Sequence, residues 1–369
     1  MKISLLVDFE NFWNSLRQDL SAAKDSVYVQ TFSFEADHIG NLLAEALTDS
    51  RARDKRILAD SFSRIVVSDK FLYSPSNWFD RELKAEVRAT RNGALILCAS
   101  GVAVKHCNPL GPTPRHLLNR NHKKLIVVDG HIAYIGGLNF SEHNAKWHDM
   151  MLRIEDTAVA KFLSEDFVDC WEGRSTSRSE TFAGNKFYSV NGRANRNAFA
   201  HVLRLIHSAR ESIFVASPYI SFPFYDYLKN ARRRGVDVTV LTPQKNNWKF
   251  FGDYARWEAL RCDLNLRLYS EGMSHLKAML IDDRYLIAGS SNFDILSYRL
   301  YEEIVAIFSD EDVIAQFRER VMIPDLAASL GVEEQFNGTR SVWDTVRVKA
   351  FNTGLSVLMS SFSPPFGRG

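Results

Sequence analysis

The chain carries one polar pattern twice, and this duplication constrains its fold more than any other feature. Residues 121–139 read NHKKLIVVDGHIAYIGGLN, and residues 274–292 read SHLKAMLIDDRYLIAGSSN. Because the two copies agree in register at every defining position, chance is not an adequate explanation, and the repeat sets the architecture. The matched positions are His122, Lys124, Asp129 and Asn139 in the first copy and His275, Lys277, Asp282 and Asn292 in the second.

Each copy lies within a longer repeat of helix and strand signals. Residues 20–31, LSAAKDSVYVQT, resemble residues 206–217, IHSARESIFVAS, and each stretch runs from a helical period into a β-branched strand. Alternating strands and helices predict an α/β domain that occurs twice. We expect a first domain over 1–175, a polar linker over 176–185, a second domain over 186–330 and a tail over 331–369. Extra sequence near 64–93 suggests an inserted helix or lid.

The spacing within the pattern points to chemistry. Residues two apart on a strand share a face, so each histidine projects beside its lysine. A turn at Asp129 or Asp282 then returns the asparagine toward the histidine, and small residues after the second strand let backbone and ligand approach closely. A single copy would be read as a surface strand end with a snorkelling lysine. Two copies facing one another would form an anion pocket with two proton-active groups, which fits displacement at a phosphodiester.

Charge and cysteine content limit the partners and the kinds of site that the chain is expected to have. A net charge of +2, from 46 basic and 44 acidic side chains, gives no broad positive field, and this disfavours nucleic acid as a partner. Four cysteines without CxxC spacing predict buried free thiols rather than a metal site or disulfides. The first apolar run ends at Asp8 and is too short for a signal peptide or membrane span. Arg120 and Lys123 are interpreted as surface charges that could also steer phosphate, and His143 and His148 as solvent-facing or at the pocket rim.

At these residues the chain resembles the phospholipase D superfamily, and segments such as SPYI, WHDMMLRIED and SSNFDILSYRLYEEI look most like bacterial cardiolipin synthases. The resemblance implies two packed domains, each a mixed sheet flanked by helices, with pseudo-twofold symmetry and one active site at their junction. It implies a phosphohistidine on His122, with His275 as acid and base, and no cofactor or metal. The lysines and asparagines would hold phosphate oxygens. Glu303 is the carboxylate expected behind His275, and Asp149 the weaker candidate behind His122. Asp129 and Asp282 are expected to stabilise the hairpins and the domain junction.

Three functions remain open. The first is phosphatidyl transfer from phosphatidylglycerol or a similar phospholipid, with hydrolysis as a side reaction, by a cytoplasmic protein in peripheral contact with the inner membrane face. The second is a phosphodiesterase acting on nucleic acid, and the third a non-catalytic lipid-binding scaffold, which is disfavoured because neither copy has lost a key residue. The tail, with Trp343, Phe351 and Leu355 among cations, suggests an interfacial helix or packing against the domain. The sequence indicates no protein partner.

Overall fold

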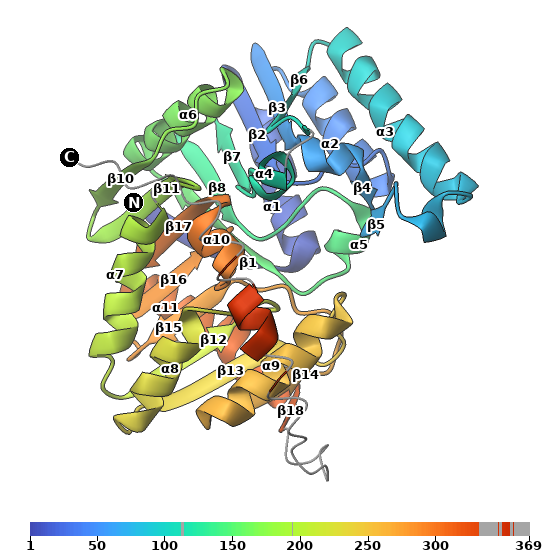
Figure 1. Ribbon diagram of the computed structural model, residues 1–369. Helices are drawn as coiled ribbons and strands as arrows, with labels where there is room; N and C mark the ends of the chain where they lie inside the picture. Colours follow the sequence, from blue (N-terminus) through green and yellow to red (C-terminus); the bar gives the residue numbers. More distant parts are fainter. Residues whose placement is uncertain (112–113, 194, 332–345, 347–348, 355–356, 358–369) are drawn as a thin grey trace, which may run out of the picture.

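The computed structural model describes residues 1–111, 114–193, 195–331, 346, 349–354 and 357. Two mixed β-sheets, each covered by helices, form the two domains in Figure 1. The chain is therefore two tandem α/β domains, as the repeat predicts.

The first sheet has the strand order β1-β9-β8-β7-β2-β3-β6. Strands β2, β3 and β6 run parallel, and the other pairs are antiparallel. Its strands are β1 (Lys2–Val7), β2 (Ser26–Thr31), β3 (Asp54–Asp60), β6 (Ala103–Cys107), β7 (Leu125–Val128), β8 (Ile132–Gly136) and β9 (Met150–Glu155). Its helices are α1 (Asp8–Ala22), α2 (His38–Asp49), α3 (Arg81–Ala99), α4 (Pro114–Leu118), α5 (Glu142–Ala145) and α6 (Thr157–Trp171).

The second sheet repeats this order as β11-β17-β16-β15-β12-β13-β14 and adds β10 and β18 at its two edges. Its strands are β10 (Arg178–Phe182), β11 (Asn185–Asn191), β12 (Ser212–Ala216), β13 (Asp237–Pro243), β14 (Asn265–Tyr269), β15 (Ala278–Ile281), β16 (Tyr285–Gly289), β17 (Glu302–Phe308) and β18 (Ser329–Gly331). Its helical elements are α7 (Asn195–Ser208), α8 (Phe224–Arg233), α9 (Lys249–Cys262), α10 (Ile295–Arg299), α11 (Glu311–Phe317), η3 (Arg318–Met322) and α12 (Ile323–Ala327). Each strand from β11 to β17 thus has a counterpart in the first sheet.

This correspondence locates the extra sequence of the first domain. Helix α3 follows β3 as α9 follows β13, so α3 has a counterpart and is not itself the insertion. The excess is the stretch between β3 and α3, which contains η1 (Ser61–Arg64), the hairpin of β4 (Val66–Val67) and β5 (Lys70–Phe71), and η2 (Pro75–Asn77). We call residues 61–80 the insertion.

The main apolar core is shared by the two domains. It joins Leu125 and Leu152 of the first sheet to Ala278 and Phe308 of the second, with Phe167 of α6 among them. The outer face of each sheet has a separate core under its own helices. Burial of this shared core, at about 25 cal/mol per Å² of apolar surface, holds the two sheets together.

The expectations about the linker and about the burial of all four cysteines are corrected, whereas one of the two alternatives for the tail, packing against the domain, gains support. The segment expected as linker contains β10, which pairs with β11 at one edge of the second sheet. Cys98 is exposed near the end of α3, whereas Cys170 and Cys262 are buried. Most of the tail lies outside the described residues, but Phe351 packs against Phe250 and Tyr254 of α9. Within the described part, no helix is both long and apolar enough to span a bilayer.

Candidate active site

The two catalytic motifs meet where the domains join. The backbone N–H of His122, just before β7, donates to the oxygen of Glu302 at 2.9 Å, and that of His275, before β15, donates to His148 at 2.7 Å. Each motif therefore pairs with the other domain, the first at the start of β17 and the second just before β9. The backbone itself fixes the two histidines at one junction.

The carboxylates behind the histidines are exchanged between the domains. Nδ1 of His122 lies 2.9 Å from Oε1 of Glu303, and Nδ1 of His275 lies 2.8 Å from Oδ2 of Asp149. This is the reverse of the expected pairing. The reason lies in the sheet order: β8 separates β7 from β9, so Asp149 is two strand spacings, roughly 10 Å, from its own domain's histidine.

The histidines and lysines form one buried electrostatic cluster. His122 and His275 are only 7% and 6% exposed, and both motif lysines are fully buried. Burial, reinforced by Lys277 and Lys124, lowers the pKa of His275 to about 3 and that of His122 well below its ordinary value. Burial also lowers the pKa of Lys124 to about 7 and lowers that of Lys277. Both imidazoles are thus neutral. An anion bound beside them would stabilise the charged forms of the histidines and lysines and so raise their pKa values.

The two carboxylates differ in charge. Burial raises the pKa of Glu303 to about 8, against the opposing effect of Lys124. Burial would also raise the pKa of Asp149, but Lys277 and the hydrogen bond with His275 outweigh it and hold that pKa below its usual range. At neutral pH the pocket therefore contains an ionised Asp149 behind His275 and a protonated Glu303 behind His122.

The ionised Asp149 also resolves a crowded contact. Nδ1 of His275 lies 2.8 Å from Nζ of Lys277 as well as from Asp149. One ring nitrogen cannot donate to the carboxylate and accept from the ammonium at once. Because Asp149 is ionised, Nδ1–H donates to it, and Lys277 is satisfied by the backbone oxygen of His275 at 2.6 Å. The neutral ring then has its lone pair on Nε2, which lies 3.2 Å from Nζ of Lys277.

Small residues make room for the carboxylates rather than for a ligand. A Cβ on Gly137 would lie 2.2 Å from Oδ1 of Asp149, so only glycine fits beside that side chain. At the matching position of the second domain, the hydroxyl of Ser290 donates to Glu303, and Ser297 donates to the same carboxylate at 2.9 Å. Each carboxylate is therefore positioned by the turn that follows β8 or β16.

Aromatic rings that sequence reasoning did not identify pack around both imidazoles. The ring of Trp147 lies 4.8 Å from that of His275, and Tyr301 lies 5.6 Å from His122. Each aromatic residue lies two positions before the carboxylate residue, Asp149 or Glu303, so Trp147 and Tyr301 occupy equivalent places in WHD and YEE. Phe32 contacts His122 from its own domain at 5.0 Å. Comparing the two repeats beyond the histidine motif would have found the Trp147 and Tyr301 pair.

The motif aspartates lie at the other end of the strands. Asp129 follows β7 and accepts hydrogen bonds from the backbone N–H groups of residues 24, 25 and 26, at 2.8–2.9 Å for its shortest contacts. Asp282 accepts the equivalent three from residues 210, 211 and 212. Each aspartate ties its hairpin to the start of the neighbouring strand within one domain. Neither lies in the pocket or at the domain junction.

The two asparagines differ in their carbonyl contacts. Oδ1 of Asn139 accepts from the hydroxyl of Thr31 at 3.3 Å and the backbone N–H of Ser33 at 3.4 Å. Oδ1 of Asn292 is buried, and no described side chain or backbone group pairs with it. The second domain's asparagine therefore keeps a free acceptor.

Three polar residues near the motifs are structural. Arg120 and Lys123, expected at the surface, are buried in ion pairs with Asp60 and Asp166, each at 2.8 Å. His148, expected to face solvent or to lie at the pocket rim, is largely buried. It is held between Asp8 and Asp325. Burial opposes its charge, but these two carboxylates prevail and raise the pKa of His148 to about 10. These charges are already paired and cannot steer phosphate.

The insertion reaches the pocket from one side. Asp69, in the β4–β5 turn, accepts a hydrogen bond from Nδ2 of Asn247 at 3.3 Å, and Asn247 accepts one from the hydroxyl of Tyr219. The Tyr219 ring lies 6.2 Å from that of His275. The other side of Asp69 faces His143, which lies 3.7 Å from it and 3.7 Å from Glu35. The insertion thus bridges both domains beside the second histidine.

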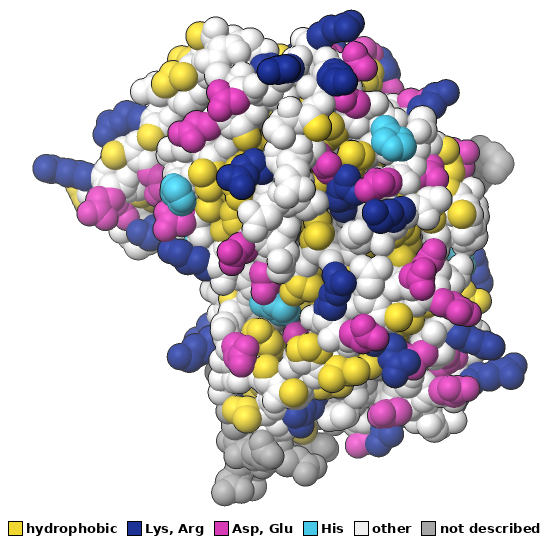
Figure 2. All heavy atoms as spheres, turned by 180° about the vertical axis from the view of Figure 1, so that it is seen from behind, with side chains coloured by type: hydrophobic (Ala, Val, Ile, Leu, Met, Phe, Trp, Pro, Cys, Tyr) yellow, Lys and Arg dark blue, Asp and Glu magenta, His cyan; other side chains and the backbone are white. Residues whose placement is uncertain are grey.

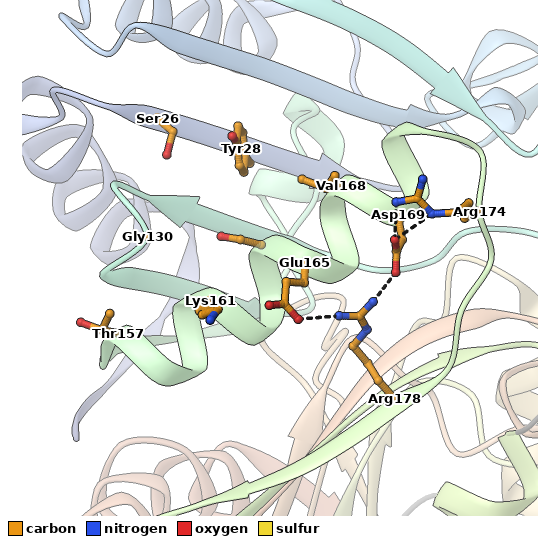
Figure 3. A pocket seen from close by; sticks show the side chains of 11 residues that line it. Ser26, Tyr28, Gly130, Thr157, Lys161, Glu165, Val168, Asp169, Arg174 and Arg178 are labelled. Carbon is orange, nitrogen blue, oxygen red and sulfur yellow. Dashed lines mark hydrogen bonds and ion pairs between the residues drawn. The ribbon is translucent and has the colours of Figure 1, made fainter.

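A separate hollow of about 680 Å³ lies along α6, as shown in Figure 3. It borders Ser26, the first residue of β2, whose backbone N–H donates to Asp129. Because Asp129 lies at the end of β7 opposite to His122, the hollow lies away from the histidines. Arg174 and Arg178 in its wall pair with carboxylates of Glu165 and Asp169, as the dashed lines show. Both arginines are therefore paired within the wall. The described residues include no cluster of three or more histidine, cysteine or acidic side chains suited to a metal.

Comparison with known proteins agrees with this geometry. The family model described as cardiolipin synthase, PLD-like domain, matches residues 16–171 and 202–322, well over half of the chain. Cardiolipin synthase 1 of Staphylococcus epidermidis is 27% identical over 97% of this chain and 74% of that protein. The major cardiolipin synthase ClsA of Bacillus subtilis is 24% identical over 87% of this chain and 69% of that protein.

A solved structure shows the same fold. The phosphatidylserine synthase of Haemophilus influenzae superposes with a TM-score of 0.72 at 13% identity, over 97% of this chain and 94% of that one. At that identity the likeness concerns the fold alone. Together with the family match over both repeats, it shows that the chain belongs to the cardiolipin synthase, PLD-like domain family and is an enzyme of the phospholipase D type.

Proposed function

We propose that the protein transfers a phosphatidyl group from phosphatidylglycerol or a similar phospholipid to an alcohol, through a phosphohistidine and with water as a competing acceptor. The exchanged pairs His122–Glu303 and His275–Asp149 carry this proposal, because they orient two imidazoles at one buried junction. Family membership supports phosphatidyl transfer at the level of the family. The proposed reaction uses two imidazoles and the cations around them.

In the first step, Nε2 of His122 attacks phosphorus. Nδ1–H of His122 donates to Glu303, which leaves the lone pair on Nε2. A phosphorus–nitrogen bond forms and the phosphorus–oxygen bond to the headgroup alcohol breaks. His275 gives its proton to the departing oxygen. The ionised Asp149 favours this assignment, because it stabilises a protonated ring on His275.

Binding of the substrate raises the pKa of His275, which the first step requires. In the empty pocket both imidazoles are neutral, so His275 must gain its proton when the substrate binds. A phosphodiester brings one negative charge to a pocket whose lysines are depressed in pKa, and so raises the pKa of every cation around it. Lys124, Lys277 and the amide groups of the two asparagines then hold its non-bridging oxygens.

In the second step, the acceptor alcohol replaces the departed headgroup. Neutral His275 takes the proton of the incoming hydroxyl as its oxygen attacks phosphorus, and the bond to His122 breaks. The unpaired Oδ1 of Asn292 is suited to accept a hydrogen bond from a hydroxyl of the acceptor. We also propose a peripheral contact with the cytoplasmic membrane face, since the substrate resides in a bilayer.

The proposal is tested by incubating the protein with labelled phosphatidylglycerol and, separately, with labelled single-stranded DNA, in a chelator. We expect transfer and hydrolysis of the lipid, with a labelled phosphohistidine that is lost in His122→Ala. The face in Figure 2 has interspersed acidic and basic side chains rather than a basic groove, which gives DNA little to bind. Cleavage of DNA with inert lipid would reject the lipid substrate.

A further inference from the structure

Exposed aromatic side chains are concentrated in the insertion and at the start of α9. They are Phe71, Tyr73, Trp78 and Phe79 of the insertion, with Trp248 and Phe250 at the start of α9, and we call them the aromatic rim. Their exposed fractions run from 42% for Phe71 to 91% for Phe79. Large exposed rings gathered in this way are unusual on a soluble surface and mark a binding face.

The rim is assembled from both domains beside the catalytic pocket. The hydrogen bond between Asp69 and Asn247 joins the insertion to the segment that precedes Trp248. From Asn247, contacts pass through Tyr219 to His275. In Figure 1 the β4–β5 hairpin lies near α5 on the right-hand side of the first domain, and Figure 2, from behind, shows a notch in the outline on the same side of the molecule.

We propose that the aromatic rim docks on the surface of a phospholipid bilayer that contains anionic lipid, and so brings the pocket to the headgroups. The inference rests on the proposed function, because a phosphodiester fixed in a bilayer can reach histidines this deeply buried only if the opening lies against the membrane. Tryptophan and tyrosine rings settle at the level of lipid headgroups. Exposed Lys245 and Lys249 flank Trp248 and complement an anionic surface.

Binding to vesicles tests the surface without requiring turnover. A variant with Trp78→Ser, Phe79→Ser and Trp248→Ser should sediment with vesicles of phosphatidylglycerol and phosphatidylcholine at least about tenfold more weakly than wild type. The matched control is Leu95→Ser with Ile96→Ser, two exposed aliphatic residues on helix α3, which follows the insertion, roughly 20 Å along that helix from its start. The control should bind as wild type. Thermal unfolding establishes that both variants are folded.

A second measurement uses a milder change that preserves folding. Brominated acyl chains quench tryptophan fluorescence on contact, and a Trp78→Phe, Trp248→Phe variant should lose most of that quenching while remaining bound. Three outcomes would overturn the docking surface: serine variants that bind vesicles as wild type, quenching that persists without these tryptophans, or a rim that proves to join two copies of the chain or to bind single-stranded DNA instead. If rim variants lose vesicle binding but wild type transfers no phosphatidyl group, the docking stands and the proposed function fails.

Discussion

Replacing Asp149 by asparagine should disable proton donation by a histidine in the other domain. The carboxylate is fully buried, ionised and 2.8 Å from Nδ1 of His275. A hydrogen bond to a charged group contributes about 1.5–3 kcal/mol, which corresponds to a loss of roughly 10- to 150-fold. An asparagine amide that donates to Nδ1 would also impose the wrong tautomer, so the loss in rate can reach about 10⁴-fold.

The assay separates attack from proton donation by changing the leaving group. The first-turnover burst is measured with phosphatidylglycerol and with a phosphatidyl nitrophenyl ester, whose leaving oxygen needs little protonation. Asp149→Asn should be severely slow on the natural substrate and largely rescued on the ester. Glu303→Gln retains an acceptor for His122, and its smaller loss should be equal on both substrates, because His122 attacks in either case. Rescue of Glu303→Gln but not of Asp149→Asn would refute the exchanged roles.

Three further predictions concern the supports of the site. Asp129→Ala should lower the free energy of unfolding by roughly 2 kcal/mol while kcat is retained, and Asp282→Ala should have the same effect. Burial opposes the charge of Asp129, but three backbone N–H groups prevail and lower its pKa. The extra stability of the wild type in urea melts should therefore shrink below about pH 4. Burial lowers the pKa of Lys124 to about 7, so kcat/KM should fall as the pH rises through that value, and calorimetry near neutral pH should detect proton uptake when inorganic phosphate binds. Gly137→Ala should lose activity as Asp149→Asn does, since its Cβ would displace that carboxylate; an active, folded variant would contradict this.

Local patterns in the sequence determine much of the fold and half of the site. The duplicated spacing identifies both histidines, both lysines and the hairpins after them, because strand period and turn residues are properties of a short segment. The strand-for-strand match of the two sheets follows from the same repeat. It also predicts one cluster at the domain junction, where the two motifs lie.

The partners of the histidines could not be read from spacing. Glu303 is close to His275 in sequence, which favours a local pair, yet β16 lies between β15 and β17 and keeps them apart. Which carboxylate meets which imidazole depends on how the domains pack, and that packing depends on the shared core. Arg120 and Lys123 were assigned to the surface for a similar reason, since their buried partners Asp60 and Asp166 are distant in sequence.

In the proposed mechanism, the exchange of carboxylates makes the domain junction part of the catalytic machinery. Each half supplies a histidine and lysine, but the acceptor and aromatic wall for each imidazole come from the other half. A half on its own would therefore hold an imidazole without orientation. In a symmetric pair of first halves, however, His122 would meet the Asp149 and Trp147 equivalents of its neighbour, so such a pair would rebuild both sites from one sequence. The fused chain can make the two imidazoles different, and an ionised Asp149 opposite a protonated Glu303 is that difference.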